Sequence, residues 1–177
     1  MSLLLLIDGY NVLSPVAPPT RNTDANWLHR ERMLLIDRLG SHLDEELRLR
    51  TCVVFDAANP PRNRASEFVV QGIQIRFAID YPEADDLIEE LINAHHSPKQ
   101  LTVISSDHRI QASARRRGAV PFDSEPWLDA LVDGNPRLGF DRKQARGGQG
   151  STKPEKPTGD LSDQSVGDWM KEFGFDE

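Results

Sequence analysis

The chain has 177 residues, of which 38% are hydrophobic and 28% charged, and its formal net charge is −7. This length predicts one domain with room for an appendage. No apolar run reaches 18 residues, which excludes a membrane-spanning helix, and a single cysteine, Cys52, excludes an internal disulfide. The acidic balance argues against a general nucleic-acid-binding surface.

Strand-like and helix-like segments alternate over the first 133 residues. Short apolar runs predict strands at 3–7, 51–55, 73–79, 101–104 and 119–122. Apolar periodicity predicts helices at 27–49, 83–95, 107–117 and 124–132, with a less regular short helix at 63–70. Because the strands are too apolar for a solvated face, the alternation predicts an α/β fold: a three-layer α/β/α sandwich around a central parallel sheet.

The composition changes after residue 134, which predicts a domain at 1–134. Residues 135–160 are rich in Gly, Lys, Arg and Pro, and this predicts a flexible linker. Residues 161–177 predict a short amphipathic helix, because apolar residues recur there at Val166, Trp169, Met170 and Phe173. We expect this helix to dock on its own domain, on another copy or on a protein partner; the alternative is a frayed tail.

An aspartate stands at the end of three of the predicted strands: Asp8, Asp56 and Asp107. The carboxyl ends of parallel strands meet at one edge of a sheet, where ligands bind, so we expect these side chains to converge. Each also has a simpler interpretation, because an aspartate is common in turns and loops and at the N-cap of a helix. Asn11, three residues after Asp8, could bind a ligand or orient Asp8 by a hydrogen bond.

A second acidic group lies in the first turn of the predicted helix 83–95. Asp85 and Asp86 interact favourably there with the helix dipole, which accounts for at least one of them. Only one can face the sheet edge, and we prefer Asp85. Asp86 or Glu89 could replace or join it.

This collection of carboxylates is typical of a divalent-metal site. Hard oxygen ligands favour Mg²⁺ or Mn²⁺, and such ions activate water and neutralise charge in phosphodiester hydrolysis. The sequence contains no P-loop, no dinucleotide-binding glycine motif and no Gly-x-Ser-x-Gly nucleophile motif.

Four blocks in this order resemble the NYN domain: LLIDGYN at 5–11, VVFD at 53–56, EADDLIE at 83–89 and VISSDH at 103–108. The resemblance is to the YacP-like branch within the PIN-like nucleases and spans residues 3–133. It implies a PIN-like, Rossmann-like fold and Mg²⁺-dependent cleavage of RNA. It also implies an endoribonuclease linked to translated mRNA and the ribosome. The implied metal ligands are Asp8, Asp85 and Asp107, with Asn11, Asp56 and Ser106 close by.

We therefore predict a cytoplasmic endoribonuclease that depends on Mg²⁺ or Mn²⁺. Asp8, Asp85 and Asp107 would hold the metal, and Asp56 would assist directly or through water. An activated water would attack phosphorus in line, leaving a 5′-phosphate and a 3′-hydroxyl. The predicted substrate contacts are Asn11, Ser106, Arg62, Arg64, Arg109 and Arg115.

Two other functions stay open at this point. One is an RNA- or ribosome-binding module whose nuclease-like site is weak or silent. The other is a small-molecule phosphohydrolase, which would use an Asp-x-Asp nucleophile motif, whereas Asp8 is followed here by Gly9 and Tyr10. Tyr10 itself could stack on a base or pack at the sheet edge.

Overall fold

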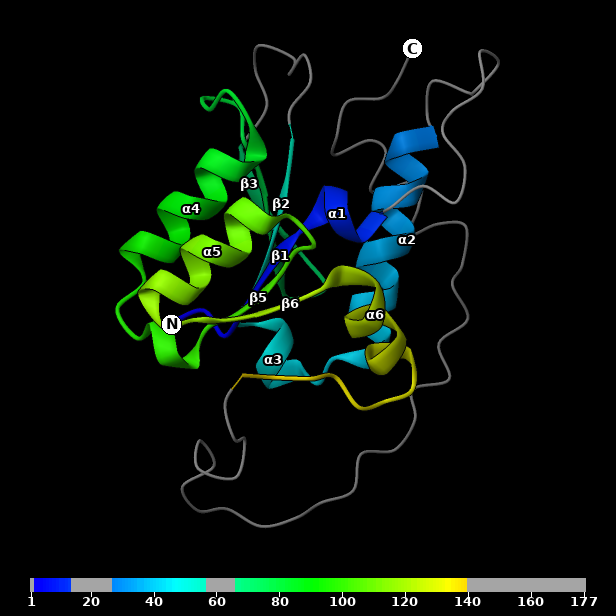
Figure 1. Ribbon diagram of the computed structural model, residues 1–177. Helices are drawn as coiled ribbons and strands as arrows, with labels where there is room; N and C mark the ends of the chain where they lie inside the picture. Colours follow the sequence, from blue (N-terminus) through cyan, green and yellow to red (C-terminus); the bar gives the residue numbers. More distant parts are fainter. Residues whose placement is uncertain (1, 14–26, 57–65, 140–177) are drawn as a thin grey trace. The chain divides into compact units, whose positions relative to one another are not determined.

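A six-stranded sheet forms the centre of the domain (Figure 1). The computed structural model describes residues 2–13, 27–56 and 66–139. The spatial order of the strands is β3-β4-β2-β1-β5-β6, and every neighbouring pair is parallel except β3 and β4. Their bounds are β1 Leu5–Asp8, β2 Thr51–Phe55, β3 Glu67–Val70, β4 Ile73–Phe77, β5 Thr102–Ile104 and β6 Val120–Phe122.

Helices connect most of these strands. They are α1 Gly9–Leu13, α2 Trp27–His42, α3 Glu45–Arg48, α4 Ala84–Ala94, α5 His108–Arg117 and α6 Ser124–Val132, with a short 3₁₀ helix at Pro98–Gln100. In the part of the chain that the structure describes, none of them has the length and apolar character needed to cross a membrane.

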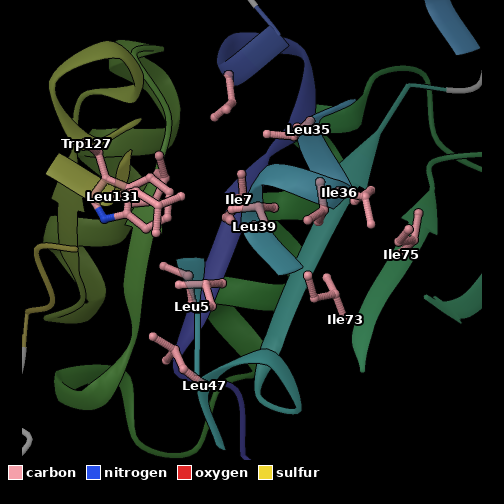
Figure 2. Packing of buried hydrophobic residues seen from close by; sticks show 14 of the residues in the cluster. Leu5, Ile7, Leu35, Ile36, Leu39, Leu47, Ile73, Ile75, Trp127 and Leu131 are labelled. Atoms are coloured by element: carbon pink, nitrogen blue, oxygen red, sulfur yellow. The ribbon is translucent and has the colours of Figure 1, made fainter. Parts of the chain in front are cut away.

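Two apolar cores lie on opposite faces of the sheet. Leu5 and Ile7 of β1 belong to one core, which also contains buried residues of α1, α2, α3 and α6 (Figure 2). Leu6, between them, belongs to the other core, with residues of α4 and α5. This alternation follows from the two-residue period of a strand. The predicted three-layer α/β/α sandwich is therefore confirmed, with α4 and α5 together on one side (Figure 1).

The sheet differs from the prediction at one edge. The prediction of a short helix at 63–70 is wrong over its last four residues, because 67–70 form β3, which runs antiparallel to β4. A two-residue turn joins the strands, and both of its residues, Gln71 (φ 52°) and Gly72 (φ 85°), have positive φ. Such turns match the twist of a hairpin. The sheet is thus mixed rather than wholly parallel.

The segment predicted as one helix, 27–49, forms two helices, α2 and α3, with a helix cap between them. The Asp44 side chain accepts a hydrogen bond from the Leu47 backbone amide at 2.9 Å and begins α3 as a separate turn. Such a cap satisfies an amide that would have no partner within the helix. The sequence patterns also missed α1, because five residues are too few to show a helical period.

The chain continues to contact the sandwich just beyond residue 134. The indole nitrogen of buried Trp127 donates a hydrogen bond to the Arg137 carbonyl at 2.8 Å. The Gly139 amide donates to Thr102 Oγ1 at 2.9 Å, and Leu138 packs against the first core. The rest of the predicted linker, residues 140–160, and the predicted helix at 161–177 lie outside the described residues.

The strand order reverses direction beside β1. From β1 the chain steps to β2 and then to β4 on one side, and it then crosses through α4 to β5 on the other side of β1. At such a reversal, the loops that follow the two central strands leave in opposite directions and open a crevice at the carboxyl ends of the strands. The ends of β1 and β5 therefore define where a ligand site is expected.

The Trp127 hydrogen bond gives a test of this packing. We expect Trp127→Phe to lower the free energy of unfolding by about 1–3 kcal/mol, because the variant loses an N–H donor and leaves a partly filled cavity. Urea denaturation measures the change. Val132→Ala, at an exposed position of the same helix, is the control and should change stability by less than about 0.5 kcal/mol. An equal loss in both variants would contradict the proposed contribution of the indole.

Candidate active site

Asp8 is the most buried acidic group at the carboxyl edge of the sheet. It ends β1 with a side chain that is only 2% exposed. Three hydrogen bonds hold the carboxylate. Asn11 donates from its side-chain amide to Oδ2 (2.6 Å) and from its backbone amide to Oδ1 (3.2 Å), and the Ser105 hydroxyl donates to Oδ2 (2.8 Å). All three donors are neutral, so they satisfy the buried carboxylate without adding a positive charge.

Gly9 allows the chain to turn from β1 into α1 and so places Asn11 over Asp8. A Cβ atom on this glycine would collide with the Phe55 ring and would lie 2.9 Å from the Val54 carbonyl oxygen. A glycine therefore follows Asp8 because the backbone passes too close to β2 at this point for a side chain.

Asp107 lies at the first amide groups of α5. Its Oδ1 accepts hydrogen bonds from the backbone amides of Arg109 (2.6 Å) and Ile110 (3.3 Å), so the N-cap interpretation is correct. The Asp107 amide in turn donates to Ser105 Oγ at 3.1 Å. Ser105 thus links Asp8 to Asp107, the two acidic residues that follow β1 and β5.

Asp56 holds the start of α4. Its Oδ1 accepts a hydrogen bond from the Ala84 backbone amide at 3.1 Å, whereas the N-cap residue itself, Glu83, makes no side-chain cap. A carboxylate from the end of β2 therefore satisfies the first amide of the helix. Asp85 is the next residue of α4, so Asp56 fixes the part of the chain that carries Asp85.

The Asp85 carboxyl is affected by both of the other acidic residues. Burial raises its pKa from the ordinary value of 3.8 to about 6, and the negative charges of Asp107 and Asp8 act in the same direction. Arg109 acts in the opposite direction. The charges of Asp8, at the end of β1, and of Asp107, at the start of α5, therefore reach Asp85 in α4.

Arg109 joins α5 to α4 through an ion-pair cluster. Its guanidinium lies 2.6 Å from Asp86 Oδ1 and 3.0 Å from Glu89 Oε2, and a second nitrogen lies 3.6 Å from Glu83 Oε2. The bonds to Asp86 and Glu89 raise the pKa of Arg109. Asp86 and Glu89 are thus engaged by a cation, while the Asp85 side chain makes no hydrogen bond or ion pair with other described residues.

The other predicted substrate contacts lie in different places. Ser106 Oγ accepts a hydrogen bond from the Ser124 amide at the start of α6, so its neighbour Ser105 is the serine that contacts Asp8. Arg115 lies two turns along α5, where it donates to the buried Gln111. Arg62 and Arg64 lie outside the described residues.

Sequence reasoning misses two residues at this edge. Ser105 reads from the sequence only as a possible helix cap, and no motif distinguishes it from Ser106. Alternation along β5 is the signal that could separate them, because Ser105 is fully buried and Ser106 is exposed. The second residue is Arg32 of α2, whose guanidinium donates to the Asp56 carbonyl at 3.2 Å; no motif indicates a helical arginine at this position.

The donor chemistry at this edge fits a hard divalent cation. Three of about four acceptor positions of Asp8 are used, and both cap bonds of Asp107 go to Oδ1, so carboxylate oxygens are left for an ion. Within residues 2–13, 27–56 and 66–139, however, no three His, Cys, Asp or Glu side chains are gathered closely enough to hold a metal as they stand. The carboxylates would have to close around the ion.

Comparison with known families places the chain. The model of the YacP-like NYN domain matches residues 5–170, which is most of the sequence. The chain belongs to the YacP-like NYN domain family. The resemblance expected from the four sequence blocks is therefore confirmed, and the family match also extends past the predicted boundary at residue 134.

Two solved structures resemble this YacP-like NYN domain. One is the crystal structure of Rae1 (YacP) from Bacillus subtilis, with a TM-score of 0.54 and 25% sequence identity over 76% of this chain and 75% of that chain. The other is a tryptophan-to-leucine mutant of the same Bacillus subtilis protein, with a TM-score of 0.52 and 25% identity over 76% and 77%. No curated protein matches the sequence.

The raised pKa of Asp85 predicts a gain in stability when its charge is removed. We expect Asp85→Asn to raise the melting temperature in EDTA at pH 7.5 by roughly 2–4 °C, because the neutral amide ends the repulsion from Asp8 and Asp107. Differential scanning calorimetry measures the shift. Asp129→Asn, at an exposed position of α6, is the control and should not change the melting temperature.

The pH dependence has a definite sign. Since the folded pKa of about 6 exceeds the ordinary 3.8, the folded state binds more protons between these values, and stability falls as pH rises through this window. The advantage of Asp85→Asn should therefore shrink as pH is lowered from 7 towards 4. An advantage that is independent of pH would contradict a charge effect.

Proposed function

We propose that this YacP-like NYN domain is an endoribonuclease that depends on Mg²⁺ or Mn²⁺. The observation that carries the proposal is the set of contacts at the edge where the strand order reverses: Ser105 hydrogen-bonds to both Asp8 and Asp107, and the charges of these two residues add to burial in raising the pKa of Asp85. Burying like charges together is costly, and a bound cation would offset that cost. Family membership supports nuclease chemistry, and the family resemblance supports RNA as the substrate.

In this proposal Asp8, Asp85 and Asp107 hold the ion. A bound Mg²⁺ or Mn²⁺ supplies a nucleophilic water at neutral pH and neutralises charge on the phosphate. Asn11 and Ser105 orient Asp8 through their hydrogen bonds, and the amides of Arg109 and Ile110 orient Asp107. Asp56 acts through the start of α4, which it holds by the Ala84 amide.

The ion pairs of Arg109 favour a role for this residue other than the predicted contact with the substrate. Arg109 neutralises Glu83, Asp86 and Glu89, so that Asp85 is the acidic residue of this turn left for a metal. We therefore propose Arg109 as a positioning residue and not as a contact of the RNA backbone. Action on mRNA at the ribosome, and a cytoplasmic location, rest on the family resemblance alone.

RNA cleavage tests the proposal directly. Purified full-length protein is incubated with end-labelled single-stranded RNA in Mg²⁺, in Mn²⁺ and in EDTA. We expect internal cuts that leave 5′-phosphate ends, that require the metal, and that fall at least about a hundredfold in Asp8→Asn and Asp107→Asn. Asp133→Asn is the matched control, because this aspartate is exposed at the end of α6, and it should retain full activity.

The other outcomes identify the alternatives. Binding of RNA without cleavage would indicate a binding module with a silent site. Release of phosphate from small esters, with no cleavage of RNA, would indicate a small-molecule phosphohydrolase. Cleavage that survives EDTA, or that persists in both aspartate variants, would overturn the assignment of the carboxylates.

The two neighbouring serines offer a sharper test of the geometry. We expect Ser105→Ala to lower activity about 10- to 100-fold, because residues that orient a metal ligand have effects of this size. Ser106→Ala removes the same hydroxyl one residue away, where it contacts the start of α6, and should leave kcat nearly unchanged. Single-turnover kinetics at saturating Mn²⁺ measures both, and the reverse order would contradict the proposed role of Ser105.

A further inference from the structure

Tyr10 is an exposed aromatic residue inside an otherwise buried turn. Its side chain is 41% exposed, whereas Asp8, Gly9 and Val12 around it are buried. It lies two residues from Asp8, so the two Cα atoms are at most about 7 Å apart. At this distance from the proposed metal site, an exposed ring is within reach of a nucleotide bound there.

Arg32 lies beside this tyrosine. The Arg32 side chain interacts with that of Tyr10, and its Nη2 donates to the Asp56 carbonyl at 3.2 Å. Burial lowers the pKa of Arg32, and the nearby Tyr10 and Asp56 side chains act against that effect. One guanidinium therefore ties α1, α2 and the end of β2 together.

An aromatic pair supports the guanidinium. The Arg32 Cζ atom lies 5.3 Å from the centre of the Phe55 ring and 5.0 Å from that of Phe77. These phenylalanines end β2 and β4, are paired in register, and have ring centres 5.8 Å apart. Cation–π contacts with two rings stabilise this position of Arg32, since a planar guanidinium stacks on aromatic faces.

The tyrosine and the acidic residues flank the same turn on opposite faces of the sheet. Phe55 belongs to the core on the α2 side, whereas Asp8, two residues after Leu6, points to the side of α4 and α5. An RNA strand that crosses this edge would therefore place a phosphate over the carboxylates and the neighbouring nucleotide near Tyr10.

We propose that the Tyr10 ring stacks on an unpaired base next to the bond that is cleaved, and that Arg32 is the positioning residue for this ring. Such stacking requires an unpaired base, because a paired base inside a duplex has both faces covered by its neighbours. The inference rests on the proposed ribonuclease function and adds to it a base-stacking position, Tyr10, beside the carboxylates.

Binding can be measured separately from cleavage. A short single-stranded RNA carrying 2-aminopurine is titrated with Asp107→Asn protein, which lacks one repulsive charge and is expected to bind without cleaving. Adding Tyr10→Leu should weaken binding about 5- to 30-fold and remove the change in 2-aminopurine fluorescence, because leucine keeps apolar volume but offers no aromatic face. Adding Tyr10→Trp should retain both the affinity and the fluorescence change.

Two controls separate stacking from structure. Leu34→Ala removes another exposed apolar side chain, from the helix that carries Arg32, and should leave RNA binding unchanged. In the otherwise wild-type protein, Arg32→Lys should raise KM severalfold with kcat nearly unchanged, since lysine keeps the charge but loses the planar contacts with Phe55 and Phe77.

These experiments distinguish a failure of the stacking inference from a failure of the ribonuclease proposal. If the wild-type protein cleaves single-stranded RNA but cuts a duplex equally well, or if Tyr10→Leu binds RNA as tightly as its parent, the stacking inference is overturned and the ribonuclease proposal stands. If the wild-type protein neither binds nor cleaves RNA, both are overturned.

Discussion

Electrostatic repulsion among carboxylates at one edge of the sheet is the constraint on which the candidate site depends. Asp8, Asp85 and Asp107 come from three different elements, and the shift in the pKa of Asp85 records how the other two act on it in addition to burial. Such an arrangement costs free energy in a protein without a cation, and natural proteins keep costly groups where function requires them. The surrounding hydrogen bonds are best understood as the means by which the fold tolerates this charge.

Two kinds of interaction stabilise the negative charge at this edge: hydrogen bonds from neutral groups, and ion pairs. Neutral donors stabilise the individual carboxylates: Asn11 and Ser105 at Asp8, and the first amides of α5 at Asp107. A cation, Arg109, makes its ion pairs with the surrounding acidic residues of α4, although its charge also acts on Asp85. Positive charge is thereby kept just outside the region where a metal would compete with it.

Much of the fold could be predicted from the sequence, because the strands are short apolar runs and the longer helices have a clear period. The hairpin of β3 and β4 could not, because Phe68, Val69 and Val70 occur in a run too short to distinguish strand from helix, and its Gln-Gly turn is a weak signal. The placement of Asp8 and Asp107 at one edge could be predicted from the parallel strands, whereas Asp85 is chosen from its place in the first turn of a helix and its role as a metal ligand stays a prediction. The choice of Ser105 over Ser106 could not be predicted, since it depends on which face of the chain is buried.

Asp56 connects the two helical layers that cover the sheet. Its side chain holds the first turn of α4 on one face, and its carbonyl accepts the bond from Arg32 on the other. One residue therefore satisfies a donor from α2 and a donor from α4, so the end of β2 joins the two outer layers of the sandwich directly.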